Sequence, residues 1–557
     1  MSTVMRYSAV LILAVLATVA GTTRHRPANH GAPCLVDSPH GPVQGLDFGA
    51  SCAFLGIPYA ASTAGNNRWK PPEPAAPWGP AVLNATTPPP GCPSINQATG
   101  ALIGSEDCLR LNIWSGQPQN GELAPVIVWL HTGAFSFASA NFAGTNGRRL
   151  AEETGVIVVA PNYRLGPFGF LAHAALEAED PGRSSTGNYG LLDQRAALAW
   201  VGDHIEDFGG DPHNVTLAGT SAGGLSTGLH LVAPGSAGLF QQAIVQSAHP
   251  TSYWATRDEA VLQGDAFATS LGCTSPADVL ACMRAATRDQ VLTALGLAAQ
   301  QVVAPANRVF WEPIVDGFEI PDQPRVLFEQ GDFEAVPTII GANRDEGWGN
   351  FITRSFPAGV TTAQYEAWVA AEFGPHAPSV LSMYPAADFT SAEEAMARVV
   401  GDGQFSCEAR RLADLIADGG LRGRGPHDNH GTGRRTKSAV FLYSYEHEID
   451  DLSLDHVIHG VETNIIFGNN YAPPFASHVL DAGDIALHVV MALAWTRFAE
   501  TGDPNPFAEW PEYRKNHERH IVFDANIGND EDLGGGVCAF WNGFFFRTML
   551  GSPEAWQ

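Results

Sequence analysis

The ten residues at positions 215–224 read VTLAGTSAGG. An apolar, strand-like run here leads straight into the pattern Gly-x-Ser-x-Gly, which is the layout of a nucleophile elbow. In such an elbow a tight strand-to-helix turn exposes the hydroxyl of Ser221, and the flanking glycines relieve the crowding of the turn. The N-terminus of the following helix favours developing negative charge. Because the chain contains 59 glycines, the pattern needs support from the rest of the sequence.

The length and composition of the chain favour a large globular protein. Its 557 residues are 45% hydrophobic and only 16% charged, which excludes a disordered chain. The formal net charge is −27. A chain this acidic repels nucleic acid and anionic membrane surfaces, so we expect no nucleic-acid partner.

Residues 1–20 have the pattern of a secretory signal peptide. Arg6 supplies the positive charge, residues 9–20 form a short apolar run, and residues 18–20 (TVA) form a cleavage site. The apolar run is too short to span a bilayer, and no later run is long enough either. We therefore expect a secreted, extracellular protein without a membrane span. The mature chain should start near Gly21.

Beyond this signal, strand-like runs alternate with helical stretches. The runs that predict buried strands are residues 126–131, 155–161, 214–219, 241–247, 338–343 and 440–445. Residues 191–201 predict one of the helices between them. This alternation indicates an α/β fold with a large, mostly parallel central sheet and helices on both faces. Residues 355–417 predict a helical, cap-like insertion, and residues 419–437, rich in Gly, Arg and His, predict an exposed loop.

Further motifs make the sequence similar to a known family. They stand in the order FLGIPYA (54–60), SEDCLRLN (105–112), NYRLG (162–166), GNYGLLDQ (187–194), FGGDP (208–212), the elbow, DEG (345–347), HGVE (459–462) and CAFWN (538–542). In these stretches the chain resembles the type-B carboxylesterases, which include cholinesterases and fungal lipases and have the α/β-hydrolase fold. The resemblance extends over nearly the whole mature chain. It implies one catalytic domain over residues 21–557, with helical insertions such as the one near residues 355–417.

Three residues in these motifs have the order that serine catalysis requires. A serine hydroxyl is a poor nucleophile at neutral pH and needs a general base, and the base needs an acid that fixes its tautomer. In α/β-hydrolases these groups follow one another as Ser, then Asp or Glu, then His. Ser221, Glu346 and His459 stand in this order. Their contexts match those of the family, so the resemblance implies that they form the catalytic triad.

The resemblance also implies the donors of an oxyanion hole. The tetrahedral intermediate needs backbone N–H groups aimed at its oxygen, and one is expected from Ala222, directly after the nucleophile. Gly133 and Ala134 match the other donor positions of the family, in the loop after the strand at 126–131. Thr132 replaces a family glycine there, and a β-branched residue would shift the loop if that position needs a positive φ.

Three further residues are expected around the reacting atoms. By resemblance, Ser247 matches a serine that hydrogen-bonds the acid of the triad, and Trp254 matches an aromatic residue of the acyl pocket. Phe135, next to the oxyanion donors, is expected to line that pocket too. The alternatives are a buried strand serine and ordinary core aromatics.

The eight cysteines fit an oxidising compartment, because an even count in a secreted chain favours disulfides. None forms a Cys-x-x-Cys pair, which argues against a zinc ribbon or a redox motif. Sequence alone allows many pairings, although close spacing favours Cys273–Cys282. The resemblance implies the pairs Cys92–Cys108, Cys273–Cys282 and Cys407–Cys538, which leaves Cys34–Cys52.

Two Asn-x-Thr sequons mark candidate glycosylation sites of a secreted protein. Asn84 lies in a loop-rich region and is the better candidate. Asn214 directly precedes the strand of the elbow, where the chain leaves little room for a glycan.

Together these features predict a secreted serine hydrolase that cleaves carboxylic esters through an acyl-enzyme intermediate. Its partner would be a small-molecule ester, and we expect no cofactor and no metal, because HERH at residues 517–520 lacks the spacing of a zinc motif. Choline esters are not expected. Thr220 stands where cholinesterases carry a glutamate, and the segment from Cys92 to Cys108 has no tryptophan to face a quaternary ammonium.

Two alternatives stay open at the level of the sequence. The first is a lipase or a feruloyl-type esterase that acts on bulkier esters, because pocket shape does not follow from motif spacing. The second, more remote, is a non-catalytic, cholinesterase-like binding protein. Such proteins typically lack a residue of the triad, whereas all three residues are present here.

The segment between Cys92 and Cys108 predicts how the enzyme behaves at a lipid surface. In related lipases this segment is a long amphipathic lid, but here it has fifteen residues, few of them apolar, and Pro93, Gly100 and Gly104 disfavour a helix. So short a segment gains little by docking on lipid at about 25 cal/mol per Å². We predict saturation kinetics on dissolved short- to medium-chain esters, with no jump in rate at the solubility limit. A sharp rise on emulsified substrate would place a lid elsewhere and favour the lipase.

Overall fold

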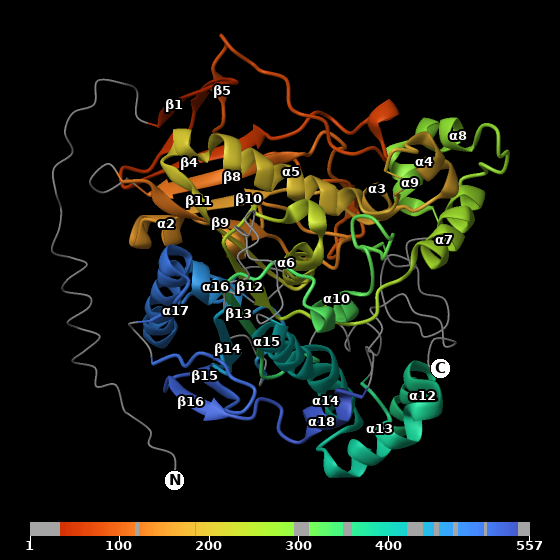
Figure 1. Cartoon of the computed structure of the whole chain (residues 1–557), viewed down its shortest axis with the longest axis vertical. Coiled ribbons are helices and arrows are strands. Elements are labelled where there is room, and N and C mark those ends of the chain that lie inside the picture. The colour runs from red at the N-terminus through yellow and green to blue at the C-terminus, as the bar shows by residue number, and fades with distance from the viewer. Residues whose placement is uncertain are drawn as a thin grey trace.

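The computed structural model describes residues 34–116, 122–183, 185–294, 311–348, 359–419, 438–449, 456–471, 477–505 and 509–543. A central sheet is covered by helices on both faces (Figure 1). None of the described helices is both long and apolar enough to cross a membrane. The described residues do not include the expected signal at residues 1–20. They also do not include the expected loop at residues 419–437, apart from Gly419.

The central sheet has eleven strands. In spatial order they are β16 (Gly528–Glu531), β15 (Arg519–Phe523), β14 (Val440–Tyr445), β13 (Thr338–Asn343), β12 (Gln242–Gln246), β11 (Gly210–Thr220), β9 (Ala124–Leu130), β10 (Ile157–Pro161), β8 (Arg110–Gly116), β4 (Ser51–Pro58) and β3 (Leu46–Asp47). From β10 to β15 the neighbours are parallel, and at both edges they are antiparallel. The expected α/β fold is confirmed, and its parallel centre consists of the six predicted strands plus β15.

Some of the described α-helices cover the two faces of this sheet, and the others pack beyond it (Figure 1). They are α2 (Arg148–Thr154), α3 (Gly166–Phe170), α4 (Ala174–Glu179), α5 (Tyr189–His204), α6 (Ala222–Val232), α7 (Arg257–Ser270), α8 (Val279–Ala285), α9 (Arg288–Thr293), α10 (Pro324–Gln330), α12 (Thr362–Phe373), α13 (Ala377–Met383), α14 (Ala392–Gly401), α15 (Cys407–Gly419), α16 (Glu462–Phe467), α17 (Ala482–Thr501) and α18 (Val537–Trp541). One face is covered by α5, α6, α10 and α15, and the other by α2, α16 and α17.

Alternate residues of the central strands belong to two separate hydrophobic clusters, one on each face of the sheet. Along β9, Val126, Val128 and Leu130 join the cluster with α5 and α6. Ile127 and Trp129 join the cluster with α16 and α17. Successive side chains of a strand point to opposite faces, so a strand covered on both sides must be apolar throughout. That requirement explains why these strands were visible as continuous apolar runs.

The segment from α12 to α15 is helical and holds a third hydrophobic cluster. A π-helical turn, Asp402–Ser406, separates α14 from α15. The cluster encloses Tyr365, Trp541 and the Cys407–Cys538 disulfide. That this segment works as a cap stays a prediction.

All four expected disulfides are present, namely Cys34–Cys52, Cys92–Cys108, Cys273–Cys282 and Cys407–Cys538. The loop closed by Cys92 and Cys108 contains a short hairpin of β6 (Ser94–Ile95) and β7 (Leu102–Ile103) and no helix. A small separate sheet near the N-terminal side contains β1 (Leu35–Ser38), β2 (Gly41–Gln44) and β5 (Leu83–Asn84).

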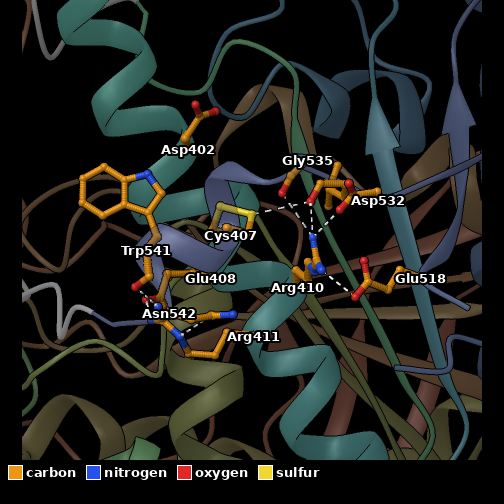
Figure 2. Close-up of a disulfide and its surroundings, with 12 residues drawn as sticks. Asp402, Cys407, Glu408, Arg410, Arg411, Glu518, Asp532, Gly535, Trp541 and Asn542 are labelled. Atoms are coloured by element: carbon orange, nitrogen blue, oxygen red, sulfur yellow. Dashed lines mark hydrogen bonds and ion pairs between the residues drawn. A yellow bond between two sulfur atoms is a disulfide. The ribbon is translucent and has the colours of Figure 1, made fainter. Parts of the chain in front are cut away.

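Two arginines of α15 hold the C-terminal segment beside the Cys407–Cys538 disulfide (Figure 2). Arg410 pairs with Glu518 at 2.5 Å, just before β15. Arg411 donates a hydrogen bond of 2.6 Å to the carbonyl oxygen of Trp541 at the end of α18. Both cysteines are fully buried, so the disulfide and Arg411 fix α18 on α15, while Arg410 holds the chain just before β15.

We predict that this disulfide is the most stabilising of the four. It joins residues 131 apart, whereas Cys92 and Cys108 are 16 apart. Constraint of the unfolded chain grows with loop length, so replacing Cys407 and Cys538 by serine should lower the free energy of unfolding by about 5 kcal/mol, against about 3 kcal/mol for the Cys92 and Cys108 pair. Urea unfolding of the two double variants measures both values. An equal or smaller loss for the longer loop would contradict the prediction.

Candidate active site

The turn between β11 and α6 has the strained geometry of a nucleophile elbow. Ser221 has φ 56° and ψ −123°, a conformation that non-glycine residues adopt only where the surroundings enforce it. Neighbouring glycines allow the turn to close: a Cβ on Gly219 would lie 2.5 Å from the carbonyl carbon of Gly223, and one on Gly224 would lie 2.5 Å from the carbonyl oxygen of Gln246. The Ser221 N–H is itself bonded to that Gln246 oxygen at 3.0 Å. The serine therefore stands half-buried at the C-terminal edge of the parallel strands.

The loop after β9 carries a run of left-handed backbone. Gly133, Ala134 and Phe135 have φ values of 116°, 46° and 54°. A Cβ on Gly133 would lie 2.1 Å from the carbonyl oxygen of Phe137, so only glycine fits there. Thr132 is not among the described residues with positive φ. The threonine that departs from the family pattern is therefore accommodated without strain, because the following residues make the turn.

The first turn of α6 is packed against this loop. A Cβ on Gly223 would lie 2.0 Å from the carbonyl oxygen of Leu130, the last residue of β9. Ala222 is the neighbour of Gly223, and Gly133 and Ala134 follow shortly after Leu130 along the chain, so all three residues flank this contact. Within the described residues, the N–H groups of these three residues have no protein acceptor. Unpaired backbone N–H donors are the kind of group that can bind an oxyanion.

A buried stack supports the same loop from below. The ring of His131 lies parallel to that of Tyr163, with centroids 4.2 Å apart. The Tyr163 hydroxyl donates to the carbonyl oxygen of His131 at 2.7 Å. Burial lowers the pKa of His131 to about 4, so this imidazole is neutral at physiological pH and serves the loop as a flat, uncharged support.

The structure brings Glu346 and His459 into direct contact, although 113 residues separate them. The distance from His459 Nδ1 to Glu346 Oε2 is 2.5 Å. The other oxygen of Glu346 accepts the N–H of Asn343 at 2.7 Å. The Glu346 side chain is fully buried, whereas that of His459 is 30% exposed. With Nδ1 bound to the acid, Nε2 of His459 is the ring nitrogen left for a serine hydroxyl.

Opposing effects set the basicity of His459. Burial lowers its pKa, but the charge and hydrogen bond of Glu346, with the charge of Glu462, raise it by more, so that the pKa of His459 lies above its ordinary value. The imidazolium that forms when a base accepts a proton is thus stabilised by two carboxyl groups.

Glu462 is a second fully buried acid that the sequence analysis did not single out. Its Oε1 accepts bonds from Thr220 and Ser247 at 3.4 Å each, and its Oε2 accepts a bond of 2.6 Å from Asn343. Burial and the neighbouring charge of Glu346 raise the pKa of Glu462. It ties the residue before the elbow serine to the segment of His459. Its place three residues after His459 in the HGVE motif was the available signal.

Ser247 differs from its expected role in one respect. Its hydrogen bond runs to Glu462 and not to Glu346, so the expectation that it bonds the acid of the predicted triad is corrected. Glu346 is instead bonded to the N–H of Asn343 and to His459. Ser247 itself has φ 49°, a second strained residue at the edge of the sheet.

The two aromatic residues expected in the acyl pocket lie together. The ring of Phe135 meets that of Trp254 at 6.4 Å and that of Phe170 at 5.2 Å. Trp254 is almost fully buried, and its indole N–H donates to the carbonyl oxygen of Pro250 at 2.9 Å. These contacts place the rings of Phe135, Phe170 and Trp254 together beside the loop at residues 133–135.

Phe405, in the π-helical turn, packs against His459. Its ring lies 5.0 Å from that of His459 and 5.6 Å from that of His249. Burial, with the nearby charge of His459, lowers the pKa of His249 to about 4. The loop that holds His249 is fastened to α15 because the Thr251 hydroxyl donates to the buried Glu408. No sequence motif marks these residues, since only the fold brings α15 to this edge.

The two sequons differ in accessibility. Asn84 is exposed at the end of β5. Asn214 lies in β11, where its side chain bonds the carbonyl oxygen of Glu500 at 3.2 Å and the amide of Gln242 at 3.1 Å. Asn214 is half-buried and the nitrogen that would carry a glycan already donates to Glu500, so Asn84 remains the better candidate.

Comparison with known proteins agrees with this geometry. The profile of the Carboxylesterase family matches residues 33–541. This chain belongs to that family. It is 34% identical over 509 residues to the fumonisin B1 esterase of Sphingopyxis macrogoltabida, which covers 89% of this chain and 87% of the relative. The acetylcholinesterase of Bungarus fasciatus is 30% identical over 567 residues, with 92% and 87% covered.

A solved structure supports the same assignment. PNB esterase superimposes on this carboxylesterase with a TM-score of 0.75 and 30% identity, covering 90% of this chain and 98% of the other. The resemblance to type-B carboxylesterases is thereby confirmed, as is the α/β-hydrolase fold. Carboxylic ester hydrolysis is accordingly the activity of this carboxylesterase. Its described residues contain no group of three or more side chains that could hold a metal ion.

The raised pKa of His459 leads to a prediction for pH. A base must be neutral to accept a proton, and the ordinary imidazole pKa is about 6.5. Because the pKa of His459 is raised, kcat/KM should fall on acidification with a midpoint above 6.5. In Glu346→Gln the midpoint should move down and kcat should drop by about 10²- to 10⁴-fold with little change in KM. A wild-type midpoint well below 6.5, or an unchanged midpoint in the variant, would contradict this assignment.

Proposed function

We propose that this carboxylesterase is a secreted serine hydrolase that cleaves small carboxylic esters through an acyl-enzyme on Ser221. The observation that carries the proposal is the 2.5 Å contact of His459 with the buried Glu346, linked through Glu462 to the residue before Ser221. This arrangement supplies a nucleophile, an oriented base and a buried counter-charge at one edge of the sheet.

The reaction proceeds in two halves. Ser221 Oγ attacks the ester carbonyl carbon while its proton moves to His459 Nε2, and the carbonyl oxygen takes the negative charge. The N–H groups of Gly133, Ala134 and Ala222 bind this oxyanion. Collapse breaks the bond to the alkoxy group, which leaves as the alcohol with the proton from His459. Water then attacks the acyl-enzyme by the same steps and releases the acid.

The donor geometry favours stabilisation of the transition state over binding of the ester. The left-handed turn at residues 133–135 and the first turn of α6 are held by close backbone contacts before substrate arrives. Donors fixed in this way need no reorganisation when charge develops. Glu346 and Glu462 stabilise the imidazolium in the same step.

Secretion and the natural ester belong to this proposal too. Four disulfides are typical of an oxidising compartment, and the signal pattern at residues 1–20 supports export. We expect uncharged short- to medium-chain esters and no choline preference, since Thr220 is occupied with Glu462 and adds no negative charge. A lipase or a feruloyl-type esterase for bulkier esters is the second candidate, because the fumonisin B1 esterase is among the relatives. A panel of p-nitrophenyl esters, methyl ferulate and a triglyceride separates these substrates.

Ser221→Ala tests the proposal directly. Alanine fits the elbow, so the variant should fold as the wild type does while kcat falls by at least about 10³-fold on p-nitrophenyl butyrate. A fluorophosphonate probe should label the wild type and not the variant. Ser38→Ala, on the remote strand β1, is the control and should keep both activity and labelling. Substantial turnover or labelling of Ser221→Ala would refute the assignment of the nucleophile.

A further inference from the structure

The predicted acid and base sit on two loops that must be held in register. Glu346 follows β13, and His459 lies on the segment that leads into α16. A hydrogen bond of 2.5 Å between their side chains tolerates little relative movement. The features that join the two loops therefore determine how well His459 is oriented.

Asp345 makes the first join by backbone pairing. Its N–H donates to the carbonyl oxygen of Val457 at 3.1 Å, and its Oδ2 accepts the N–H of Val457 at 2.9 Å. Nearby, the Asn343 amide donates to the carbonyl oxygen of Ile458 at 2.9 Å. These bonds fix the two loops on the side that faces β13.

Trp348 and His456 make the second join by stacking. Their ring centroids are 3.9 Å apart and their planes differ by 12°. Trp348 lies two residues after Glu346, and His456 lies three residues before His459. Both rings are half-buried. A parallel stack at this distance combines dispersion with loss of apolar surface from water, so it resists separation of the two loops.

The loop that carries Glu346 also packs closely against the helical segment from α12 to α15. A Cβ on Gly347 would lie 1.9 Å from the carbonyl oxygen of Ala397 in α14, and one on Gly401 would lie 3.4 Å from the N–H nitrogen of Gly347. Trp348 packs against both the α16–α17 cluster and the α12–α15 cluster. Trp348 thus lies where these two clusters meet, and its ring stacks on that of His456.

We propose that the stacked pair of Trp348 and His456 is a positioning device that keeps Glu346 against His459 during turnover. The proposal rests on the function proposed above. Neither ring donates to or accepts from Glu346 or His459 in any bond of the described residues, so both act through the backbone of the two loops. Without the stack, the two loops would depend on the bonds of Asp345 and Asn343 on the side that faces β13, and the contact of Glu346 with His459 would loosen.

The variants Trp348→Ala and His456→Ala test this role. Each should lower kcat on p-nitrophenyl butyrate by about 10- to 100-fold, the cost of a misplaced catalytic group, with KM changed less than about twofold. The double variant should lose no more than the larger single loss, because one interaction is removed in all three cases. Trp348→Phe and His456→Phe keep a stacking ring and should restore most of the rate.

The pH profile separates positioning from a structural role. Glu346 raises the pKa of His459, and the other titratable groups that influence this histidine, Glu462 and His249, are not altered by the variants. A looser Glu346 contact should therefore move the acidic midpoint of kcat/KM to lower pH in Trp348→Ala and His456→Ala. The phenylalanine variants should keep the wild-type midpoint.

Trp78→Ala is the matched control. Trp78 is also half-buried and meets a histidine ring, His40, edge-on at 5.4 Å, in the N-terminal region and away from both loops. It should keep the wild-type kcat and midpoint. Unchanged kinetics in Trp348→Ala, or a rate loss with a lower melting temperature and an unmoved midpoint, would overturn the proposal. Failure of the serine nucleophile itself would appear separately, as undiminished turnover in Ser221→Ala.

Discussion

The close approach of α6 to the end of β9 is the constraint on which the site depends. The carbonyl oxygen of Leu130 occupies the space where any side chain at Gly223 would lie. Only with glycine there can the first turn of α6 pack against the end of β9, from which the left-handed loop at residues 133–135 follows. Ser221, with its strained backbone, directly precedes this helix. The cost of the positive φ values is met by the packing of two strands and a helix around them.

Charge in the site is arranged around one half-exposed imidazole. Two buried carboxyl groups, Glu346 and Glu462, face His459 from the interior, while His131 and His249 are held neutral by burial. A positive charge is therefore favoured at His459 and disfavoured at the neighbouring histidines. The proton that leaves a serine has one suitable acceptor, and nearby histidines do not compete for it.

Much of the fold could be predicted from the sequence because its centre is buried on both faces. Strands β9 to β14 had to be apolar throughout, and each was visible as a short apolar run. The two antiparallel edges were harder to predict. β4 and β8 contain Pro58, Arg110 and Ser115 among their apolar residues, and β16 is entirely exposed. Neither periodicity nor composition marks such strands, because pairing with a neighbour determines them.

The candidate site divides in the same way. Ser221, Glu346 and His459 were predictable because motifs surround them and because serine chemistry requires their order. The partner of Ser247 and the stack of Trp348 on His456 were not, since each joins residues more than 100 positions apart. A motif reflects the residues that a local turn requires. It does not indicate which side chain from a distant loop will contact that turn in the folded protein.

The Cys407–Cys538 disulfide has a consequence for the order in which the molecule is assembled. Phe405, which packs on His459, lies two residues before Cys407, and the partner cysteine lies in the last described helix, α18. During synthesis the elbow, the loop at residues 133–135 and the loop of Glu346 all leave the ribosome long before residue 538 does. The turn that places Phe405 against His459 is therefore among the last parts of the molecule to be cross-linked. A chain cut short before α18 would carry every residue of the proposed triad and still lack the disulfide that fixes this turn.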